Sequence, residues 1–139
     1  MKKTLFSEIV TLTTAIKNCE VSGNEEWYYK HSDALDKIES DHLPRGSGID
    51  SGCKIDREST TDHKLVIDSS FHLMDENGYY DGWLDFQVIV TPSLQFGASV
   101  DIKGRFSDRN YKYDGHRDYL HEMFDYELNQ EIETNDLYR

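Results

Sequence analysis

This sequence of 139 residues has few basic residues and no long apolar run. It has 15 Lys and Arg against 27 Asp and Glu, so its formal net charge is −12 with His counted as neutral. This balance disfavours direct binding to nucleic acid or to an anionic membrane, because like charges repel. No apolar run approaches the ~20 residues that span a bilayer, and Glu8 interrupts the start before a signal-peptide pattern develops. We therefore expect a cytoplasmic protein.

The sequence also lacks the spacings that carry catalysis or metal binding. Cys19 and Cys53 form no CxxC pair and are expected to be free thiols. There is no G-x-S-x-G or H-E-x-x-H motif. Gly46, Gly48 and Gly52 miss the G-x-G-x-x-G spacing by one residue. The sequence predicts no enzyme activity, no metal site and no cofactor.

Length and composition favour a single folded domain. The chain is 37% hydrophobic and 12% aromatic, which is too apolar for a disordered acidic tail, and its length allows a substantial core. We expect one domain over residues 1–139. Its parts are a helical hairpin over 1–43, a loop and antiparallel sheet over 44–107, and an acidic C-terminal helix over 108–139.

Two amphipathic patterns open the chain. The first places its main apolar residues at spacings of four and three: Leu5, Ile9, Leu12, Ile16 and Cys19. Gly23 supplies a C-terminal stop and Asn24 an N-cap for a second helix. The apolar side of that helix is predicted to be Trp27, His31, Leu35 and Ile38. Pro44 should end it, so the two helices are expected to form an antiparallel hairpin.

The apolar period then changes from that of a helix to that of a strand. The glycine-rich residues 43–53 are interpreted as a flexible crossover, although a short strand around 49–55 would join the sheet edge. Apolar residues then alternate with polar ones from Leu65, with a turn at Asn77-Gly78 and a second turn at Pro92-Ser93. A third strand runs from Leu94 to Phe106. We expect three or four antiparallel strands with one buried face.

A third helix is predicted over about Arg117 to Glu133. Its apolar residues recur every four positions: Leu120, Phe124, Leu128 and Ile132. Two helices, several strands and a final helix do not alternate as βαβ units. The predicted fold class is therefore α+β, with the C-terminal helix packed on one face of the sheet.

The acidic residues are concentrated near the end of the chain. From Asp118 to Tyr138 there are seven acidic residues and no Lys or Arg. The candidate binding residues are Asp118, Glu122 and Asp125 on one helix face, continued by Glu133 and Asp136. This face is either simply solvated or a surface that imitates nucleic acid and binds a basic groove.

A second candidate is the aromatic turn between the first two strands. Tyr79, Tyr80, Asp81 and Trp83 lie close together there. Their rings either pack over the sheet as part of a tight hairpin or contact a protein partner, since Tyr and Trp are common interface anchors. A further alternative is a small-ligand or metal site built from His72, Asp75, Asn77, Asp81 and Tyr79.

Three segments together resemble a family of small proteins carried by bacteriophages and prophages. These segments are Leu43-Pro44-x-Gly46-Ser47-Gly48-Ile49-Asp50-Ser51-Gly52, then Phe71-His72-x-Met74-Asp75-x-Asn77-Gly78-Tyr79-Tyr80-Asp81-Gly82-Trp83, and Val88-Ile89-Val90-Thr91-Pro92-Ser93. Arg45, Leu73 and the longer stretch from Ser107 to Gly115 depart from the pattern of the family. The resemblance implies a phage setting in the cytosol of a host cell and supplies no catalytic residues.

These observations predict a binding protein that inhibits a host nucleic-acid-handling or defence factor, such as a CRISPR effector or a restriction system. Its partner would be a host protein with a basic surface. The alternatives are a ligand-binding or metal-binding accessory domain and a homo-oligomeric phage accessory protein.

Overall fold

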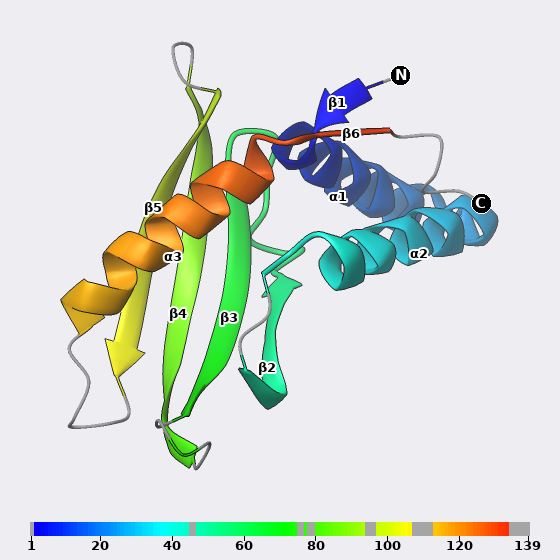
Figure 1. Cartoon of the computed structure of the whole chain (residues 1–139). Coiled ribbons are helices and arrows are strands. Elements are labelled where there is room, and N and C mark those ends of the chain that lie inside the picture. The colour runs from blue at the N-terminus through cyan, green and yellow to red at the C-terminus, as the bar shows by residue number, and fades with distance from the viewer. Residues whose placement is uncertain are drawn as a thin grey trace.

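The chain folds into an α+β architecture, which confirms the predicted fold class (Figure 1). The computed structural model describes residues 2–44, 47–74, 77, 80–93, 97–106 and 113–133. Helices α1 (Leu5–Ser22) and α2 (Glu25–Asp41) form a pair beside a four-stranded antiparallel sheet. Helix α3 (Tyr113–Leu128) crosses one face of that sheet.

The sheet has the strand order β2-β3-β4-β5, and every neighbouring pair is antiparallel. Its strands are β2 (Ser47–Ile55), β3 (Leu65–Met74), β4 (Tyr80–Ser93) and β5 (Gly97–Phe106). Along β4, Phe86 and Val88 are buried while Asp85 and Gln87 are exposed. This alternation confirms the predicted buried and solvated faces.

The turn predicted at Pro92-Ser93 is wrong. Both residues belong to β4, where Pro92 pairs with Ala98 and Ser93 pairs with Gly97. A proline lacks only one ladder donor, and the end of a strand tolerates this loss. The chain therefore reverses after Ser93, and the expected strand residues Leu94 and Phe96 lie outside the described residues.

The glycine-rich segment is also more regular than predicted, because residues 47–55 form the edge strand β2. Its pairing shifts from Ser47 opposite His72 to Gly52 opposite Ser70. Five positions along β2 thus match two along β3, so the pairing is irregular between Ser47 and Gly52. The segment is an irregularly paired strand in place of the predicted crossover, and the short strand expected around 49–55 is confirmed.

The helix boundaries follow the predicted caps. Gly23 ends α1 with a φ of 72°, and the Asn24 side chain accepts a hydrogen bond from the Trp27 backbone N–H at 3.3 Å. Leu35 and Ile38 are buried as predicted. Trp27 is 45% exposed, so its predicted place on the buried face is wrong. Its ring instead lies beneath the Lys30 ammonium, 4.6 Å from the ring centroid.

The two ends of the described chain meet in a small sheet that the sequence did not reveal. Strand β1 (Lys2–Thr4) pairs antiparallel with β6 (Glu131–Glu133). The Leu5 N–H also donates to the Gln130 carbonyl at 2.8 Å. The predicted helix to Glu133 is therefore wrong beyond Leu128, because the chain turns to pair with β1. Ile132 remains buried in this strand.

One hydrophobic core joins the sheet to all three helices. Its fully buried large side chains come from α1, α2, β3, β5 and α3: Leu5, Ile9, Leu12, Ile16, Leu35, Ile38, Leu65, Ile67, Ile102, Leu120 and Phe124. Burial of this apolar surface is the main force that holds the helices against the sheet.

Candidate protein-binding surface

Helix α3 is fixed on the sheet by its apolar side. Leu120, Phe124 and Leu128 are buried, as their spacing of four predicted. The Phe124 ring meets Phe86 of β4 nearly edge to face, with centroids 6.0 Å apart. This packing sets the rotation of α3 and so determines which residues face solvent.

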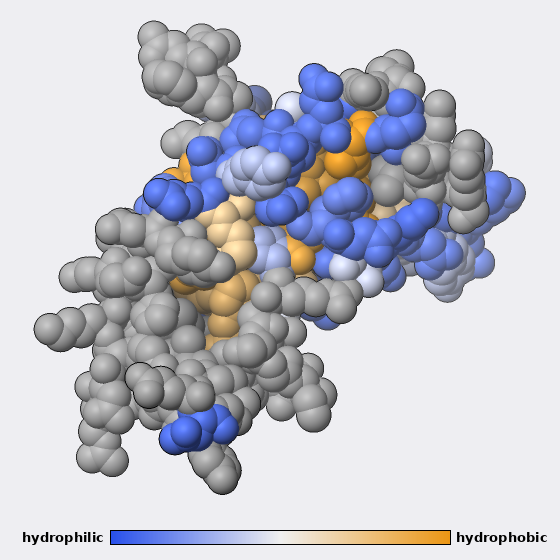
Figure 2. Space-filling model, in the orientation of Figure 1, coloured by the Kyte–Doolittle hydropathy of each residue, from blue (hydrophilic) through white to orange (hydrophobic). Residues whose placement is uncertain are grey.

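The opposite side of α3 carries two of the predicted carboxylates, Glu122 and Asp125. Glu122 and Asp125 are both exposed, and Tyr126 beside them is 65% exposed. The Asn129 side-chain NH₂ donates to the Asp125 carbonyl at 2.8 Å and to its carboxylate at 3.3 Å. Among the side chains that the structure describes, no Lys, Arg or His forms an ion pair with Glu122 or Asp125. Figure 2 shows a largely hydrophilic surface over this part of α3.

The structure separates the other predicted members of the acidic face. Asp118 lies in α3 with Glu122 and Asp125. Glu133 lies in β6 opposite Lys2, so its predicted place on the helix face is wrong. The reason is that the helix ends at Leu128 and the chain continues as a strand. Asp136 lies outside the described residues.

The aromatic hairpin forms a second region, at the far end of β3 and β4 from the C-terminal half of α3 (Figure 1). Tyr80, Asp81 and Trp83 belong to β4, where Tyr80 pairs with Met74 and Trp83 pairs with His72. The register shifts between these two pairs. Tyr79 lies outside the described residues. The structure thus does not bring the hairpin and the exposed face of α3 together.

The alternative ligand site is only partly within the described chain. His72 lies in β3, Asp81 lies in β4 and Asn77 lies in the turn between them, whereas Asp75 and Tyr79 fall outside the described residues. In the part of the chain that the structure describes, no group of three or more His, Cys, Asp or Glu could hold a metal ion. The metal hypothesis therefore gains no support from a ligand cluster.

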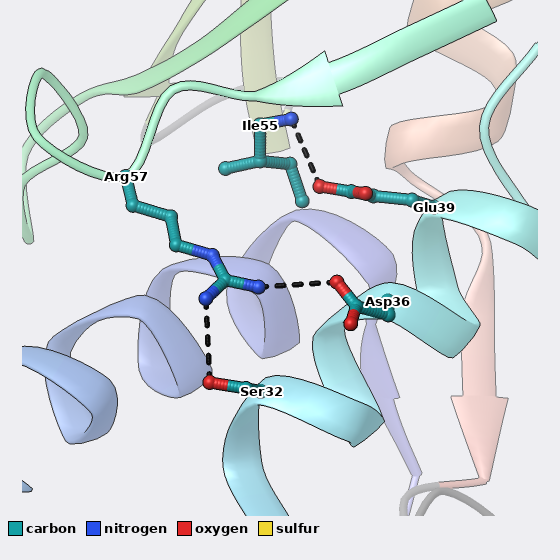
Figure 3. A network of polar contacts seen from close by, with 5 residues as sticks. All are labelled: Ser32, Asp36, Glu39, Ile55 and Arg57. Atoms are coloured by element: carbon teal, nitrogen blue, oxygen red, sulfur yellow. Dashed lines mark hydrogen bonds and ion pairs between the residues drawn. The ribbon is translucent and has the colours of Figure 1, made fainter. Parts of the chain in front are cut away.

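A polar cluster on α2 was not foreseen from the sequence (Figure 3). Arg57, just after β2, donates to Asp36 at 3.1 Å and to the Ser32 hydroxyl at 3.3 Å. Glu39 accepts a hydrogen bond from the Ile55 backbone N–H at 3.0 Å. Ser32, Asp36 and Glu39 recur at spacings of four and three, so they lie on one side of α2. In the sequence, this spacing alone indicated a polar side of α2, and it did not identify Arg57 or Ile55 as the groups that this side contacts.

Burial alters the acid-base behaviour of this region. It raises the pKa of Glu39, and the neighbouring Asp36 carboxylate adds to the rise, while the hydrogen bond from Ile55 opposes it. Burial also raises the pKa of the nearby Cys53 thiol to about 11. Cys53 donates to the Pro44 carbonyl and accepts from the Ser69 hydroxyl, each at 3.2 Å. At neutral pH this thiol is protonated and is a poor nucleophile.

No protein-family model, curated protein or solved structure matches this chain. No helix among the described residues is both long enough and apolar enough to cross a membrane.

Proposed function

We propose that this protein is a phage-type inhibitor that binds a basic surface of a host protein through the exposed face of α3. The target would be a nucleic-acid-handling or defence factor, for example a CRISPR effector or a restriction system. The contact residues on α3 are Asp118, Glu122 and Asp125. By occupying the basic groove, the helix would exclude the nucleic acid that the target needs.

The observation that carries this proposal is the different use of acidic residues on α2 and α3. Helix α2 has six acidic residues and two lysines, and α3 has five acidic residues and one arginine. Their excess of negative charge is therefore equal. On α2, three carboxylates bind groups of the protein itself: Glu26 with Lys30, Asp36 with Arg57, and Glu39 with Ile55. Among the described side chains of α3, no carboxylate has a cationic partner.

Exposed carboxylates such as Glu122 and Asp125, which have no cationic partner among the described side chains, direct their negative field into solvent. Such a field attracts surfaces rich in Lys and Arg and accelerates their encounter. The same basic surfaces bind the phosphates of nucleic acid. A helix that offers several carboxylates can therefore compete for them, whereas nucleic acid itself is repelled by this chain.

The decisive experiment compares two variants that lose the same number of charges. Glu122→Gln with Asp125→Asn neutralises the α3 face, and Asp33→Asn with Asp41→Asn neutralises two exposed residues of α2. Each tagged protein captures partners from host lysate, and the bound partner is challenged with duplex nucleic acid and with raised salt. We expect both challenges to release the partner, because salt screens exposed charges.

The partner should be lost with the α3 variant and retained with the α2 variant. Addition of the wild-type protein to the purified partner should then block its binding to nucleic acid. Full capture by the α3 variant would refute the proposal. Equal loss in both variants would also refute it, because the effect would then follow total charge and not the α3 face.

A further inference from the structure

The end of α3 is not determined by the residues that follow it. The helix ends at Leu128, and residues 131–133 form strand β6. Gly115 is the last glycine of the sequence and Pro92 is the last proline, so neither of the residue types that most often stop a helix follows Leu128. Ile132 also continues the apolar spacing of four along α3. Helix α3 therefore ends because the chain pairs with β1.

The hydrogen bonds at the end of α3 are close to those of one further turn. The Tyr126 carbonyl accepts from the Gln130 side-chain amide at 3.1 Å, and the Gln130 backbone N–H donates to the Glu127 carbonyl at 3.2 Å. In a continued α-helix, that N–H would donate to Tyr126, four residues back. Asn129 does not adopt the left-handed conformation that ends many helices. At Gln130, extension of the helix thus exchanges one carbonyl acceptor for its neighbour.

The strand form depends on a short contact with β1. Strands β1 and β6 form three residue pairs, and a two-stranded ribbon of this length has little stability of its own. At the start of α1, Glu8 is buried, and its Oε2 lies 3.7 Å from the Lys3 Nζ of β1. Among the described residues, this oxygen has no hydrogen-bond partner. A buried acceptor without a hydrogen bond destabilises the arrangement that contains it, so β1 holds the strand form weakly.

We propose that residues 129–133 are a two-state segment, which forms β6 when it pairs with β1 and continues α3 when β1 is released. The structure contains the strand form. The helical form would place Glu133 on the side of α3 that carries Glu122 and Asp125, since it follows them by 11 and 8 residues, about three and two turns. Release of β1 would therefore enlarge the acidic face. The use of that larger face by a partner rests on the proposed function.

The charge of the segment determines which form the free protein favours. Helix α3 has no basic residue in its last turn, and Glu131 and Glu133 follow it. Carboxylates near the C-terminal end of a helix are unfavourable, because that end carries a negative partial charge. The free protein therefore favours the strand form. A basic surface bound to α3 would offset this repulsion and would gain a contact with Glu133, so it would favour the helical form.

The first test compares Lys3→Pro with Lys2→Pro in the full-length protein, by the Cα chemical shifts of residues 131–133. Each variant loses one positive charge from β1. Because the Leu5 N–H donates to the Gln130 carbonyl, the alternation of an antiparallel ladder directs the Lys3 N–H toward β6 and the Lys2 N–H away from it. Proline removes this N–H. We expect helical shifts in Lys3→Pro and strand shifts in Lys2→Pro.

Loss of Lys3 also leaves Glu8 buried without its cation, so a second pair of variants makes the test independent of that loss. Gln130→Ala and Gln130→Gly both remove the same side-chain amide, but alanine favours a helix and glycine opposes it. Chemical exchange saturation transfer detects minor states by NMR. We expect a minor state with helical shifts at residues 131–133. Its population should be about fivefold larger with alanine than with glycine, as their helix propensities predict.

Random-coil shifts at residues 131–133 in a Lys3→Pro protein that is otherwise folded would overturn the inference, because the segment would then only fray. If Lys3→Pro unfolds throughout, the Gln130 variants decide. No helical minor state in Gln130→Ala, or equal populations in both variants, would also overturn it. Neither measurement involves a partner. A capture result that refutes the proposed function therefore leaves the two-state segment to be judged by these shifts alone.

Discussion

Helices α2 and α3 carry the same excess of acidic residues but attach to the sheet in different ways. Both bury apolar residues, Leu35 and Ile38 on α2 and Leu120 and Phe124 on α3. Among the described side chains, only those of α2 add polar contacts to the neighbouring strand and the turn after it; these contacts, Arg57 with Asp36 and the Ile55 N–H with Glu39, form a polar clamp. The net charge of a helix therefore does not show whether its carboxylates stabilise the fold. Only the contacts of those carboxylates show this.

The largest effect should come from removing the apolar anchor of α3. Phe124→Ala empties a fully buried site beside Phe86. We expect a loss of about 3–5 kcal/mol in the free energy of unfolding, from a total of ~5–15 kcal/mol for a domain. Urea denaturation measures this loss. Tyr126→Ala, on the exposed side of the same helix, should change stability by less than ~0.5 kcal/mol. Equal losses would show that α3 is not held mainly by its apolar side.

Breaking the clamp of α2 should have a smaller effect. Arg57→Gln removes the charged partner of Asp36, whose side chain is 63% exposed. Because partly exposed ion pairs contribute little, we expect a loss of about 0.5–1 kcal/mol that decreases as salt is added. Lys64→Gln removes an equal charge from an exposed residue and is the matched control. A loss no greater than in that control would mean that the clamp does not stabilise α2.

The raised pKa of Glu39 predicts a pH dependence of stability that is specific to this clamp. Its folded-state pKa is raised, mainly by burial, so the folded state takes up its proton more readily than the unfolded state. Above the folded pKa, the buried Glu39 carboxylate is charged and destabilises the folded state. As pH falls from neutral through that pKa, the carboxylate is protonated and this penalty is lost. Denaturant unfolding of the wild-type protein and Glu39→Gln at several pH values isolates this contribution, because other groups cancel in the difference.

The free energy of unfolding of the wild-type protein should rise relative to that of Glu39→Gln as the solution is acidified. Asp56, whose pKa is lowered by hydrogen bonds from Ser59, has the opposite pH dependence but is present in both proteins. A difference that does not change with pH would contradict the assignment to Glu39.

The sequence predicted what depends on local pattern and missed what depends on distant contacts. The caps at Gly23 and Asn24 follow from residue chemistry within one turn. The end of α3 does not, because Leu128 and Ile132 keep helical spacing while β1, at the other end of the chain, draws residues 131–133 into a strand. Helical spacing and a strand can bury the same isoleucine, so the pattern alone could not distinguish them.

In the candidate site, too, local pattern predicted some features and distant contacts determined others. The exposed position of Glu122 and Asp125 followed from the spacing of Leu120, Phe124 and Leu128. The use of the α2 carboxylates did not, because Arg57 is 21 residues from Asp36 in the sequence. No periodicity links the two. Without that contact, the acidic faces of α2 and α3 look equivalent.

The smallest stability change should come from neutralising the exposed face of α3. Glu122 and Asp125 are three positions apart on one helix, where like charges destabilise by about 0.2–0.5 kcal/mol. Their replacement by Gln and Asn should therefore leave the free energy of unfolding unchanged or raise it by a few tenths of a kcal/mol, as measured by urea denaturation at low salt. Asp33→Asn with Asp41→Asn is again the charge-matched control. A loss greater than ~1 kcal/mol would mean that these carboxylates stabilise the fold. An unchanged fold would show that α3 does not need them for its own structure, which is the condition under which a partner can use them.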